Sequence, residues 1–412
     1  MKPMPVQVDA LVIGAGPAGA AAASILHQRG HSVLVLERST FPRFVIGESL
    51  LPRSMDLLET AGLLDDAAQR GYLKKHGAAF LRGDEVSSFD FSQQHTKGWS
   101  WTWQVPRSEF DLGLTQTIQR MGIDLRFQHT VTEVVPGAPA RVTVVDDEGQ
   151  KSEVQARFVV DASGYGRVLP RLLDLDAPST LAERHSLFAW FENDVREEGL
   201  DAGRTWVCVH PKGPWIWVIP FSNGKTSVGV VAPPEFLAGY PEDPEERLRA
   251  VLGEEPNVAR RLASASMTMK PVLIDGYSTA VTQLHGPGWV LVGNSGEFLD
   301  PVFSAGVTVA LESAVLAGGL AADELEGATV DWQTAYAEPL VGAIGVYRSF
   351  IDGWYSGDLP GIFFSPEHDP VIKAQICSVL AGYLLDPTNP FVAQHHRKIS
   401  VLAKVVRRPN QI

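Results

Sequence analysis

Cysteine is scarce in this chain of 412 residues, which contains only Cys208 and Cys377. The two thiols are far apart in the sequence and belong to no Cys-x-x-Cys or His/Cys cluster, so neither a disulfide framework nor a zinc site is expected. We therefore expect no bound metal ion and a reducing, cytoplasmic location.

The sequence also lacks the segments that direct proteins to membranes or anchor them there. Its first apolar run, residues 10–13, stops at Gly14 and follows no basic segment, so we expect no signal peptide. We also expect no stretch long enough to span a bilayer.

Positive charge is in deficit, because 35 Lys+Arg stand against 48 Asp+Glu and the formal net charge is -13. Such a chain repels a phosphate backbone, so no nucleic-acid partner is expected. One local concentration of basic residues follows a helical pattern near the C-terminus, at His395–Lys398, Lys404, Arg407 and Arg408. It is interpreted either as a solvated helix face or as a docking surface.

The N-terminal pattern predicts a strand over 8–13, a helix over 18–29 and a strand over 32–37. The turn between the first strand and the helix carries a Gly-x-Gly-x-x-Gly sequence, made of Gly14, Gly16 and Gly19. Glu37 ends the second strand about 20 residues later, as in dinucleotide-binding units. The glycines let the backbone approach a pyrophosphate at the helix N-terminus, and Glu37 can accept hydrogen bonds from an adenosine ribose.

Two later segments look like further strand ends that face a nucleotide. An apolar run ends at Asp161 and is followed by a Ser-Gly turn and Arg167. A second buried strand, 289–294, leads through Asp300 and Pro301 to a helix predicted over 307–325. A ligand that reaches both helix starts is extended, as FAD is.

Alternation of apolar and polar residues dominates the middle of the chain and predicts a separate antiparallel sheet. The candidate strands are 77–82, 99–105, 187–192, 205–210, 214–220 and 225–232. Asn223-Gly224 predicts a hairpin between the last two. Helical patterns prevail from about Trp332 onward.

Five of the ten tryptophans fall in two alternating sets, each with its indoles on one face of a strand. For Trp99, Trp101 and Trp103 the favoured interpretation is an aromatic core face. Trp215 and Trp217 lie in a more distinctive sequence, Trp-Ile-Trp-Val-Ile-Pro.

Taken with several other stretches, that sequence resembles the flavin-dependent halogenases, in the branch that acts on phenols or pyrroles. The matching stretches are residues 14–19, 41–49, 75–77, 106–111, 161–164, 215–220 and 300–307, so the resemblance extends to about residue 365. Flavin hydroxylases share the dinucleotide turn, the Arg-x-x-Phe-Asp element and the Asp-Pro loop. The lysine and the two tryptophans carry the halogenase resemblance.

The resemblance implies an α/β fold, with an FAD-binding dinucleotide domain of the glutathione-reductase/hydroxylase type, an inserted antiparallel β-sheet substrate domain and a helical C-terminal tail. The FAD-binding domain is expected at 1–75, 107–175 and 286–330. The substrate domain is expected at 76–106 and 176–285, and the helical region at 331–412.

The resemblance also implies a reaction and a site for it. A separate flavin reductase supplies FADH2, and O2 and a halide, chloride or bromide, then give hypohalous acid. Lys75 delivers the halogen, and Trp215 and Trp217 line the passage to it. Lys74 is a rival, because only one of two adjacent residues on a strand can point inward. The resemblance implies that FAD is contacted by Gly14, Gly16, Gly19, Glu37, Arg38, Glu48, Ser49, Arg107, Asp161, Asp300 and Pro301. It implies that the halide is bound by Ser304, Ala305 and Gly306.

Two positions depart from the family pattern. Tryptophan halogenases carry a glutamate where this chain has Phe303, so the expected substrate is a phenol or pyrrole, free or tethered to an acyl carrier protein. Asn294 stands where many relatives have aspartate. Two alternatives stay open: an NAD(P)H-dependent flavin hydroxylase of aromatic rings, and a flavin-binding protein of a pigment or polyene pathway that does not halogenate.

Overall fold

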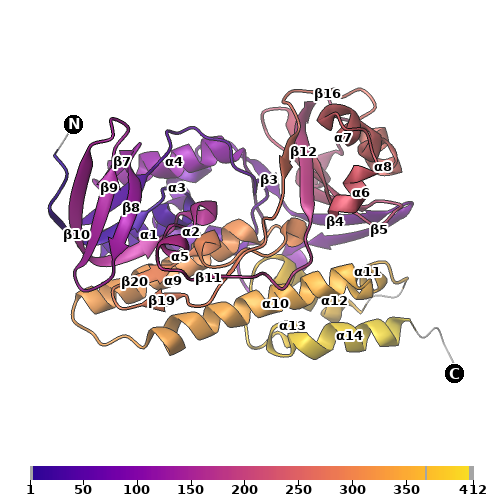
Figure 1. The fold of residues 1–412 in the computed structure, drawn as a ribbon. Helices are drawn as coiled ribbons and strands as arrows, with labels where there is room; N and C mark the ends of the chain where they lie inside the picture. The colour runs from indigo at the N-terminus through magenta and orange to yellow at the C-terminus, as the bar shows by residue number, and fades with distance from the viewer. Residues whose placement is uncertain (1–2, 367–368, 408–412) are drawn as a thin grey trace.

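Two β-sheets stand side by side above a layer of helices in the computed structural model, which describes residues 3–366 and 369–407. Figure 1 shows the sheet built from the N-terminal part of the chain at one end and the sheet from the middle at the other, with the orange and yellow C-terminal helices running beneath both. Arg408, one of the basic residues predicted near the C-terminus, lies outside the described residues.

The first sheet has the strand order β19-β20-β10-β1-β2-β7, and its four central pairings, from β20 to β7, are parallel. Its strands are β1 (Gln7–Ile13), β2 (Val33–Glu37), β7 (Asp124–Phe127), β8 (Thr130–Val135), β9 (Ala140–Val145), β10 (Lys151–Asp161), β19 (His285–Gly286) and β20 (Trp289–Leu291). The antiparallel pairs β8–β9 and β9–β10 extend it.

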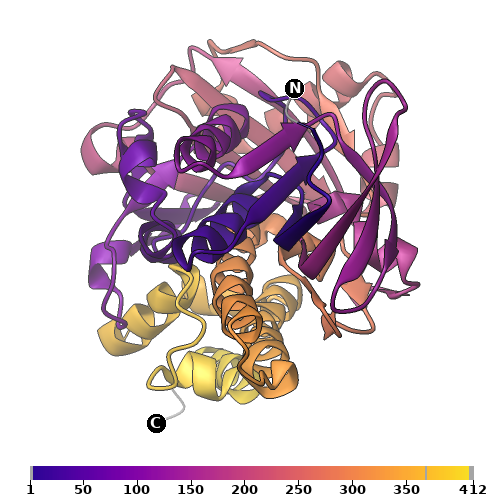
Figure 2. The same cartoon turned by 90° about the vertical axis from the view of Figure 1, so that its left-hand side faces the viewer.

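Both faces of this sheet are buried, which explains why its strands are almost continuously apolar. Ala10 and Val12 pack on one side with residues of α1 (Pro17–Gln28), α4 (Arg107–Arg120) and α9 (Gly306–Leu325). Leu11 and Ile13 pack on the other side with residues of β8 and β9. Figure 2 shows α1 and α9 below the sheet. This sheet therefore presents the carboxyl ends of β1, β10 and β20 at one edge, where α1 and α9 begin.

The second sheet has the order β16-β12-β15-β14-β13-β4-β5, with β17 also paired to β12. Its strands are β4 (Gly77–Arg82), β5 (Glu85–Asp90), β12 (His185–Glu192), β13 (Thr205–Val209), β14 (Trp215–Pro220), β15 (Lys225–Ala232), β16 (Ser266–Met267) and β17 (Val272–Ile274). One face packs against α7 (Pro244–Gly253) and α8 (Pro256–Arg261). The other face, with Trp215 and Trp217, packs against the C-terminal helices.

Two expectations about this second sheet are wrong. The sheet is mixed rather than antiparallel, because β4 pairs with β13 in parallel. The segment 99–105 does not join it: only β6 (Thr102–Gln104) forms, and it pairs with β3 (Leu73–Lys75) in a separate two-stranded sheet. Alternation of side chains predicts which residues share a face, but it does not say which strand supplies the backbone hydrogen bonds.

The predicted hairpin is confirmed, since β14 and β15 pair from Trp215↔Val231 to Pro220↔Thr226. Gly224 has a φ of +83°, a conformation that glycine adopts without strain. The alternation within β14 then turns Trp215 and Trp217 to the same face.

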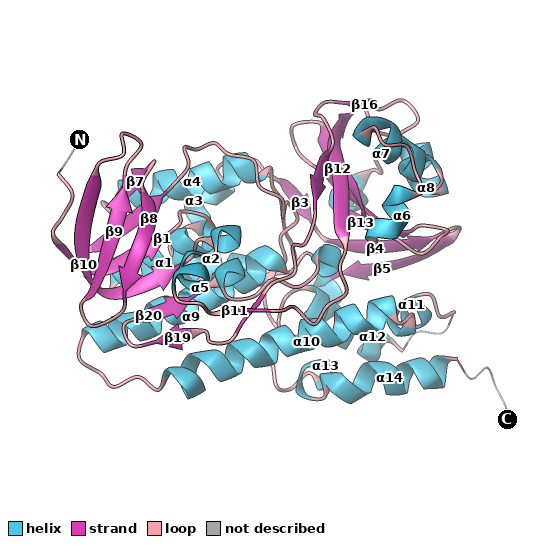
Figure 3. Cartoon of the chain, in the orientation of Figure 1, coloured by secondary structure: helices cyan, strands magenta, loops and turns pink. Residues whose placement is uncertain are grey.

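Helices make up the C-terminal part, as expected (Figure 3). They are α10 (Glu338–Tyr355), α11 (Asp358–Phe363), α12 (Pro370–Leu380), α13 (Pro390–Ala393) and α14 (His395–Val406). The shorter helices elsewhere are α2 (Arg53–Thr60), α3 (Leu64–Ala68), α5 (Val168–Leu172) and α6 (Pro234–Ala238). The predicted fold class is confirmed, whereas the exact domain boundaries stay a prediction.

The expectation that no stretch could cross a bilayer is wrong on length and composition. Over the described ranges, α9 is the one helix that is long and apolar enough, and half of it is buried inside the molecule. It packs against α1 in the core beside the first sheet, and this packing explains the apolar composition of α9 without a membrane.

Candidate active site

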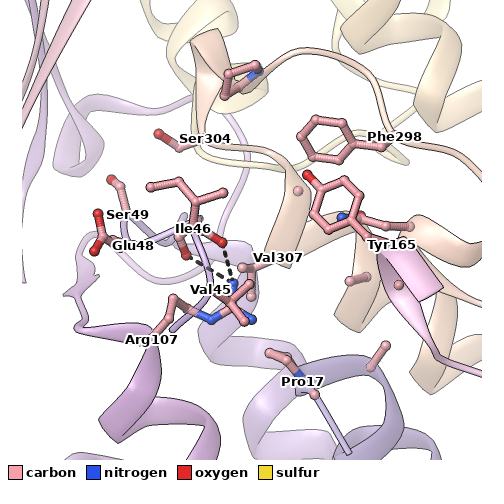
Figure 4. A pocket seen from close by; sticks show the side chains of 18 of the residues that line it. Pro17, Val45, Ile46, Glu48, Ser49, Arg107, Tyr165, Phe298, Ser304 and Val307 are labelled. Carbon is pink, nitrogen blue, oxygen red and sulfur yellow. Dashed lines mark hydrogen bonds between the residues drawn. The ribbon is translucent and has the colours of Figure 1, made fainter. Parts of the chain in front are cut away.

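A cleft of about 470 Å³ lies where the two sheets meet. It runs from the glycine turn after β1, past Arg107, to Trp215 and Trp217 on β14 and the start of α9. In Figure 4, Glu48 and Ser49 lie on one side of it, Tyr165 and Phe298 lie on the other, and Pro17 marks the start of α1. The cleft thus joins both predicted nucleotide-facing edges.

The three glycines of the first turn have different roles. Gly14 has a φ of +97°, which only glycine adopts readily. Gly16 lines the cleft, and the nearest described atom to an added Cβ there is Arg43 Nη2, 3.6 Å away. Gly19 faces away from the cleft, and a Cβ there would lie 1.9 Å from the Gly14 carbonyl oxygen. Gly16 therefore leaves room for a ligand, whereas Gly19 allows helix and turn to pack.

Glu37 is buried at the edge of the cleft and is held by two backbone groups. Its Oε2 accepts from the Ala15 amide at 3.0 Å and its Oε1 from the Ser39 amide at 2.9 Å. Each carboxylate oxygen can accept a further hydrogen bond, so Glu37 can receive the hydroxyls of a ribose. Arg38 lines the cleft next to it.

Arg107 stands at the middle of the cleft and is fixed from behind. It forms a two-bond ion pair with Asp111, at 2.8 and 3.0 Å, and donates to the Ile46 carbonyl at 2.9 Å (Figure 4). Such a held guanidinium presents its remaining N–H groups in a fixed direction, which suits a phosphate or hydroxyl partner.

Asp161 and Asp300 lie behind the cleft wall rather than on it. Asp161 accepts from the amides of Ser163, at 2.8 Å, and Leu169, at 2.6 Å. Both of its oxygens are therefore used to fold the loop 162–166, which does line the cleft. Asp300 in turn accepts from the Val302 amide and the Tyr355 hydroxyl. Neither side chain is among the residues that line the cleft, so their direct contact with a cofactor, expected from the sequence, stays a prediction.

The start of α9 forms the end of the cleft beyond Arg107. Pro301 lines it, and Ser304, with a φ of +58°, turns the chain into the helix. Ser304 and Gly306 line the cleft, whereas Ala305, the N-cap residue, is buried beside it. No side chain caps this helix, so its first amides are available to an anion.

Trp215 and Trp217 form an aromatic wall at the same end. Their rings lie 6.1 Å apart between centroids, and both side chains are almost fully buried. Trp217 Nε1 donates to Ser227 Oγ at 3.1 Å, and Trp215 Nε1 donates to the Tyr355 hydroxyl at 3.0 Å. Both indoles are thereby fixed in orientation.

Lys75 is the lysine that points inward. Only 1% of it is exposed, and its Nζ donates to Ser49 Oγ at 2.8 Å and to the Leu50 carbonyl at 3.0 Å. Lys74 is exposed, with its Nζ 4.1 Å from the centroid of the Trp101 ring. Burial lowers the pKa of Lys75 to about 7.

Ser49 connects Lys75 to the cleft. Its hydroxyl is hydrogen-bonded to Thr205 Oγ1 at 2.9 Å, and both residues line the cleft, while Lys75 lies behind them. Gln104 Nε2 donates to the same Thr205 oxygen at 2.8 Å. A buried polar path therefore leads from the cleft to the amine.

Glu48 lies beside Ser49 with one oxygen on the Trp190 indole, whose Nε1 donates to Oε1 at 2.8 Å. Within the described part of the chain, no hydrogen-bond partner reaches the other oxygen, Oε2. Burial raises the pKa of Glu48 to about 7. A buried carboxyl with one free oxygen in a cleft is a place where a ligand donor completes the hydrogen bonding.

Sequence reasoning missed several residues of the cleft. Phe44 and Ile46 lie within residues 41–49, a stretch that resembles the halogenases, and Tyr165 follows the glycine turn after Asp161, so the sequence carried a signal for all three. Thr205 gave none, because it comes from a distant strand that only the tertiary fold brings to Ser49.

These features fit FAD. A pyrophosphate needs the space at Gly16 and the uncapped N-terminus of α1, and a ribose needs an acceptor such as the Glu37 carboxylate. A polar ring system needs donors such as the fixed Arg107 and the uncapped N-terminus of α9. In the described residues, three or more His, Cys, Asp or Glu nowhere gather into a group that could hold a metal ion. The fold and the cleft define an α/β flavoprotein in which two helix N-termini, those of α1 and α9, face the FAD site.

The comparison with known families agrees: the model described as "FAD binding domain" matches residues 7–331, and the chain belongs to this family. A curated relative, the 1H-pyrrole-2-carbonyl-(peptidyl-carrier protein) chlorinase of Pseudomonas fluorescens, is 27% identical over 401 residues, which cover 91% of this chain and 89% of that protein.

Two solved structures extend the comparison. A flavoprotein/dehydrogenase from Cytophaga hutchinsonii is 46% identical, with a TM-score of 0.95 and coverage of 97% of this chain and 99% of that one. The myxobacterial chondrochloren halogenase CndH is 28% identical, with a TM-score of 0.76 and coverage of 99% of both chains. The predicted resemblance is confirmed, since the relatives include flavin-dependent halogenases, which are oxidoreductases.

Proposed function

We propose that this protein halogenates an electron-rich aromatic ring, a phenol or a pyrrole, with FADH2, O2 and chloride or bromide. The observation that carries the proposal is the hydrogen bond of 2.8 Å between Lys75 Nζ and Ser49 Oγ, which links a buried amine to the aromatic end of the cleft. A solvated lysine would have no such link.

When bound in its reduced form, FAD would supply two electrons and two protons to O2, which with a halide ion and one further proton gives hypohalous acid and water. The residues proposed to hold it are Gly14, Gly16, Glu37, Arg38 and Arg107 along the cleft, with Glu48, Ser49 and Pro301 near its far end. Gly19, Asp161 and Asp300 support these positions from behind.

The chain's own groups then divide the work. The amides that follow Ser304, at Ala305 and Gly306, bind the halide at the positive end of α9. Trp215 and Trp217 keep an aromatic substrate away from the oxygen chemistry and so suppress hydroxylation. Ser49 and Thr205 provide hydrogen bonds along the way to Lys75.

Lys75 completes the transfer. With its pKa near 7, a substantial fraction of the amine is neutral at neutral pH and carries a free lone pair. It either donates a hydrogen bond to hypohalous acid or takes the halogen on nitrogen with release of water. The ring then receives the halogen and returns a proton to the amine.

The substrate proposed is a ring tethered to a carrier protein. The relatives from Pseudomonas fluorescens and Pseudoalteromonas luteoviolacea are named for pyrrole-2-carbonyl groups on a peptidyl-carrier protein, which supports this choice. Phe303, buried on the α9 loop, adds no charge that would bind a free amino acid. We place the reaction in the cytoplasm, together with a separate flavin reductase, and the two free buried thiols are consistent with that compartment.

A second candidate is flavin-dependent oxidation without halogenation, supported by the description of the 46% identical Cytophaga protein as a flavoprotein/dehydrogenase. The experiment that decides is mass spectrometry of phenols and of pyrrolyl and hydroxyaryl carrier thioesters after incubation with the protein, FAD, a reductase, NADH, O2 and either halide. We expect a halogenated product, and Lys75→Ala removes it while FADH2 oxidation continues. The matched Lys74→Ala variant keeps the product.

Other results point elsewhere. Hydroxylated product without added halide, with NADPH consumed by the protein alone, would establish the hydroxylase alternative. Oxidation of a substrate with no incorporation of oxygen or halogen would establish the second candidate.

A further inference from the structure

Tyr355 connects the aromatic wall and the end of the cleft through two partly buried hydrogen bonds. Its hydroxyl accepts from Trp215 Nε1 at 3.0 Å and donates to Asp300 Oδ2 at 2.8 Å. Trp215 belongs to β14, Tyr355 ends α10, and Asp300 precedes α9. Three segments that are distant in the sequence are thus joined at one phenol.

Asp300 in turn shapes the loop at the start of α9. Its Oδ1 accepts from the Val302 amide at 2.9 Å, as the cap of a short 3-10 helix over Pro301–Phe303. Ser304 then adopts a φ of +58°, and α9 begins two residues later. A charged acceptor makes such a cap stronger than a neutral one, so the loop depends on the ionisation of Asp300.

Few charged groups surround this carboxylate. Burial raises the pKa of Asp300 to about 6, against the opposing effects of the Tyr355 hydroxyl, the Val302 amide and the Arg184 charge. Arg184 comes from the segment before β12 and lies 3.5 Å above the Tyr355 ring. Tyr277, from the segment after β17, is a further titratable group near this site, and burial together with the charge of Asp300 raises the pKa of its phenol.

We propose that Tyr355 is a positioning residue that holds Trp215 and the Asp300 loop in one arrangement, and that it keeps Asp300 ionised at neutral pH. The inference rests on the proposed function, because the loop it orders, Asp300–Gly306, carries the proposed halide amides. Loss of the Tyr355 hydroxyl leaves the carboxylate with one donor fewer, so Asp300 takes up a proton at higher pH and the loop loses its charged cap.

The test compares Tyr355→Phe with Tyr347→Phe. Tyr347 also belongs to α10 and is fully buried, but its hydroxyl donates to the Val379 carbonyl at 3.3 Å, away from the cleft. In the plot of halogenation rate against pH, we expect the acidic limb of Tyr355→Phe to shift to higher pH by about one unit. This shift is the effect of one hydrogen bond to a charged group. The halide KM rises several-fold while kcat is little changed. Tyr347→Phe keeps the acidic limb and the halide KM of the unmodified protein.

A second measurement needs no turnover. In FAD-free protein, the free energy of unfolding is measured for both variants from pH 8 to pH 5. The folded pKa of Asp300 lies above its unfolded value, so proton uptake by the folded state relieves the lost hydrogen bond as the pH falls. The destabilisation of Tyr355→Phe relative to Tyr347→Phe should therefore shrink toward pH 5.

An unchanged acidic limb together with a pH-independent stability difference would overturn the inference. If the unmodified protein makes no halogenated product, the proposed function fails, and the unfolding comparison alone still decides whether Tyr355 controls Asp300.

Discussion

Lys75 owes its chemistry to burial. Its neighbours, Ser49 and Leu50, offer a hydroxyl and a carbonyl but no negative charge. Burial therefore lowers its pKa without a compensating ion pair, and the resulting amine suits transfer of an electrophile.

This burial predicts how stability depends on pH. The unfolded chain binds the Lys75 proton more tightly than the folded chain, so the folded state gains stability as the pH rises from about 7 toward 10.5. Relative to Lys75→Met, the free energy of unfolding of the unmodified protein should rise by about 1 kcal/mol per pH unit between pH 7.5 and 9. Urea denaturation at several pH values measures this, and Lys74→Met serves as the exposed control. Parallel curves for the unmodified protein and Lys75→Met would show that the amine stays charged.

A second prediction concerns Gly16 and Gly19, because a side chain added at Gly16 would enter the open cleft whereas one added at Gly19 would clash with the backbone. Gly16→Val places its side chain in the open cleft, so the protein should fold but bind FAD at least about tenfold more weakly. Gly19→Ala forces a Cβ against the Gly14 carbonyl, and we expect a loss of stability of about 3 kcal/mol. Flavin fluorescence titration and denaturant unfolding separate the two effects. Full FAD affinity in folded Gly16→Val would remove the nucleotide site from this turn.

The hairpin of β14 and β15 is the element that fixes the aromatic wall. Gly229 on β15 lies directly behind Trp217, and a Cβ there would come within 2.4 Å of the indole and 2.3 Å of Phe188 Cβ. The missing side chain therefore makes the space that the indole occupies.

Gly229→Ala should displace the Trp217 ring. We expect a loss of stability of about 1–3 kcal/mol from overpacking, and less halogenated product per FADH2 oxidised, because the wall between the oxygen chemistry and the substrate is disturbed. Gly253→Ala is the control, since no described atom lies within 4 Å of a Cβ at that helix position. Product yield and unfolding are measured together, and equal yields in the two variants would contradict the role of the wall.

The distribution of charge over the protein decides which partners can approach it. The net charge is -13, yet α14 contains no acidic residue and exposes Arg397 and Lys404 beside Val401 and Val405. Arg407 is less available, because it pairs with Asp358 at 2.9 Å. An acidic carrier protein would be repelled by most of the surface and attracted by this helix.

If α14 guides a carrier, a carrier-bound hydroxyaryl thioester should react faster than the free acid at low salt. The double variant Arg397→Glu/Lys404→Glu should lower the rate on the carrier-bound form by about tenfold and leave the free acid unaffected, with the difference lost at high salt. Rates measured for both substrates at two salt concentrations check this. Equal rates in all arms would leave a free small molecule as the substrate.

Local patterns in the sequence determined the elements that follow short-range rules. The glycine turn, Glu37, the hairpin at Asn223-Gly224 and the pairing of Trp215 with Trp217 on one face depend on backbone conformation and on the periodicity of a strand, which neighbouring residues fix. The class of cofactor followed from the same local signals.

Tertiary structure alone decided which distant residues meet. Burial of Lys75 rather than Lys74 depends on β3 pairing with β6, which also bridges to Ser49, and Thr205 reaches the Ser49 hydroxyl from another sheet. The same holds for Tyr355, which lies 55 residues from Asp300 and 140 from Trp215. Contacts over such separations arise from the packing of whole elements, and no local pattern in the chain encodes them.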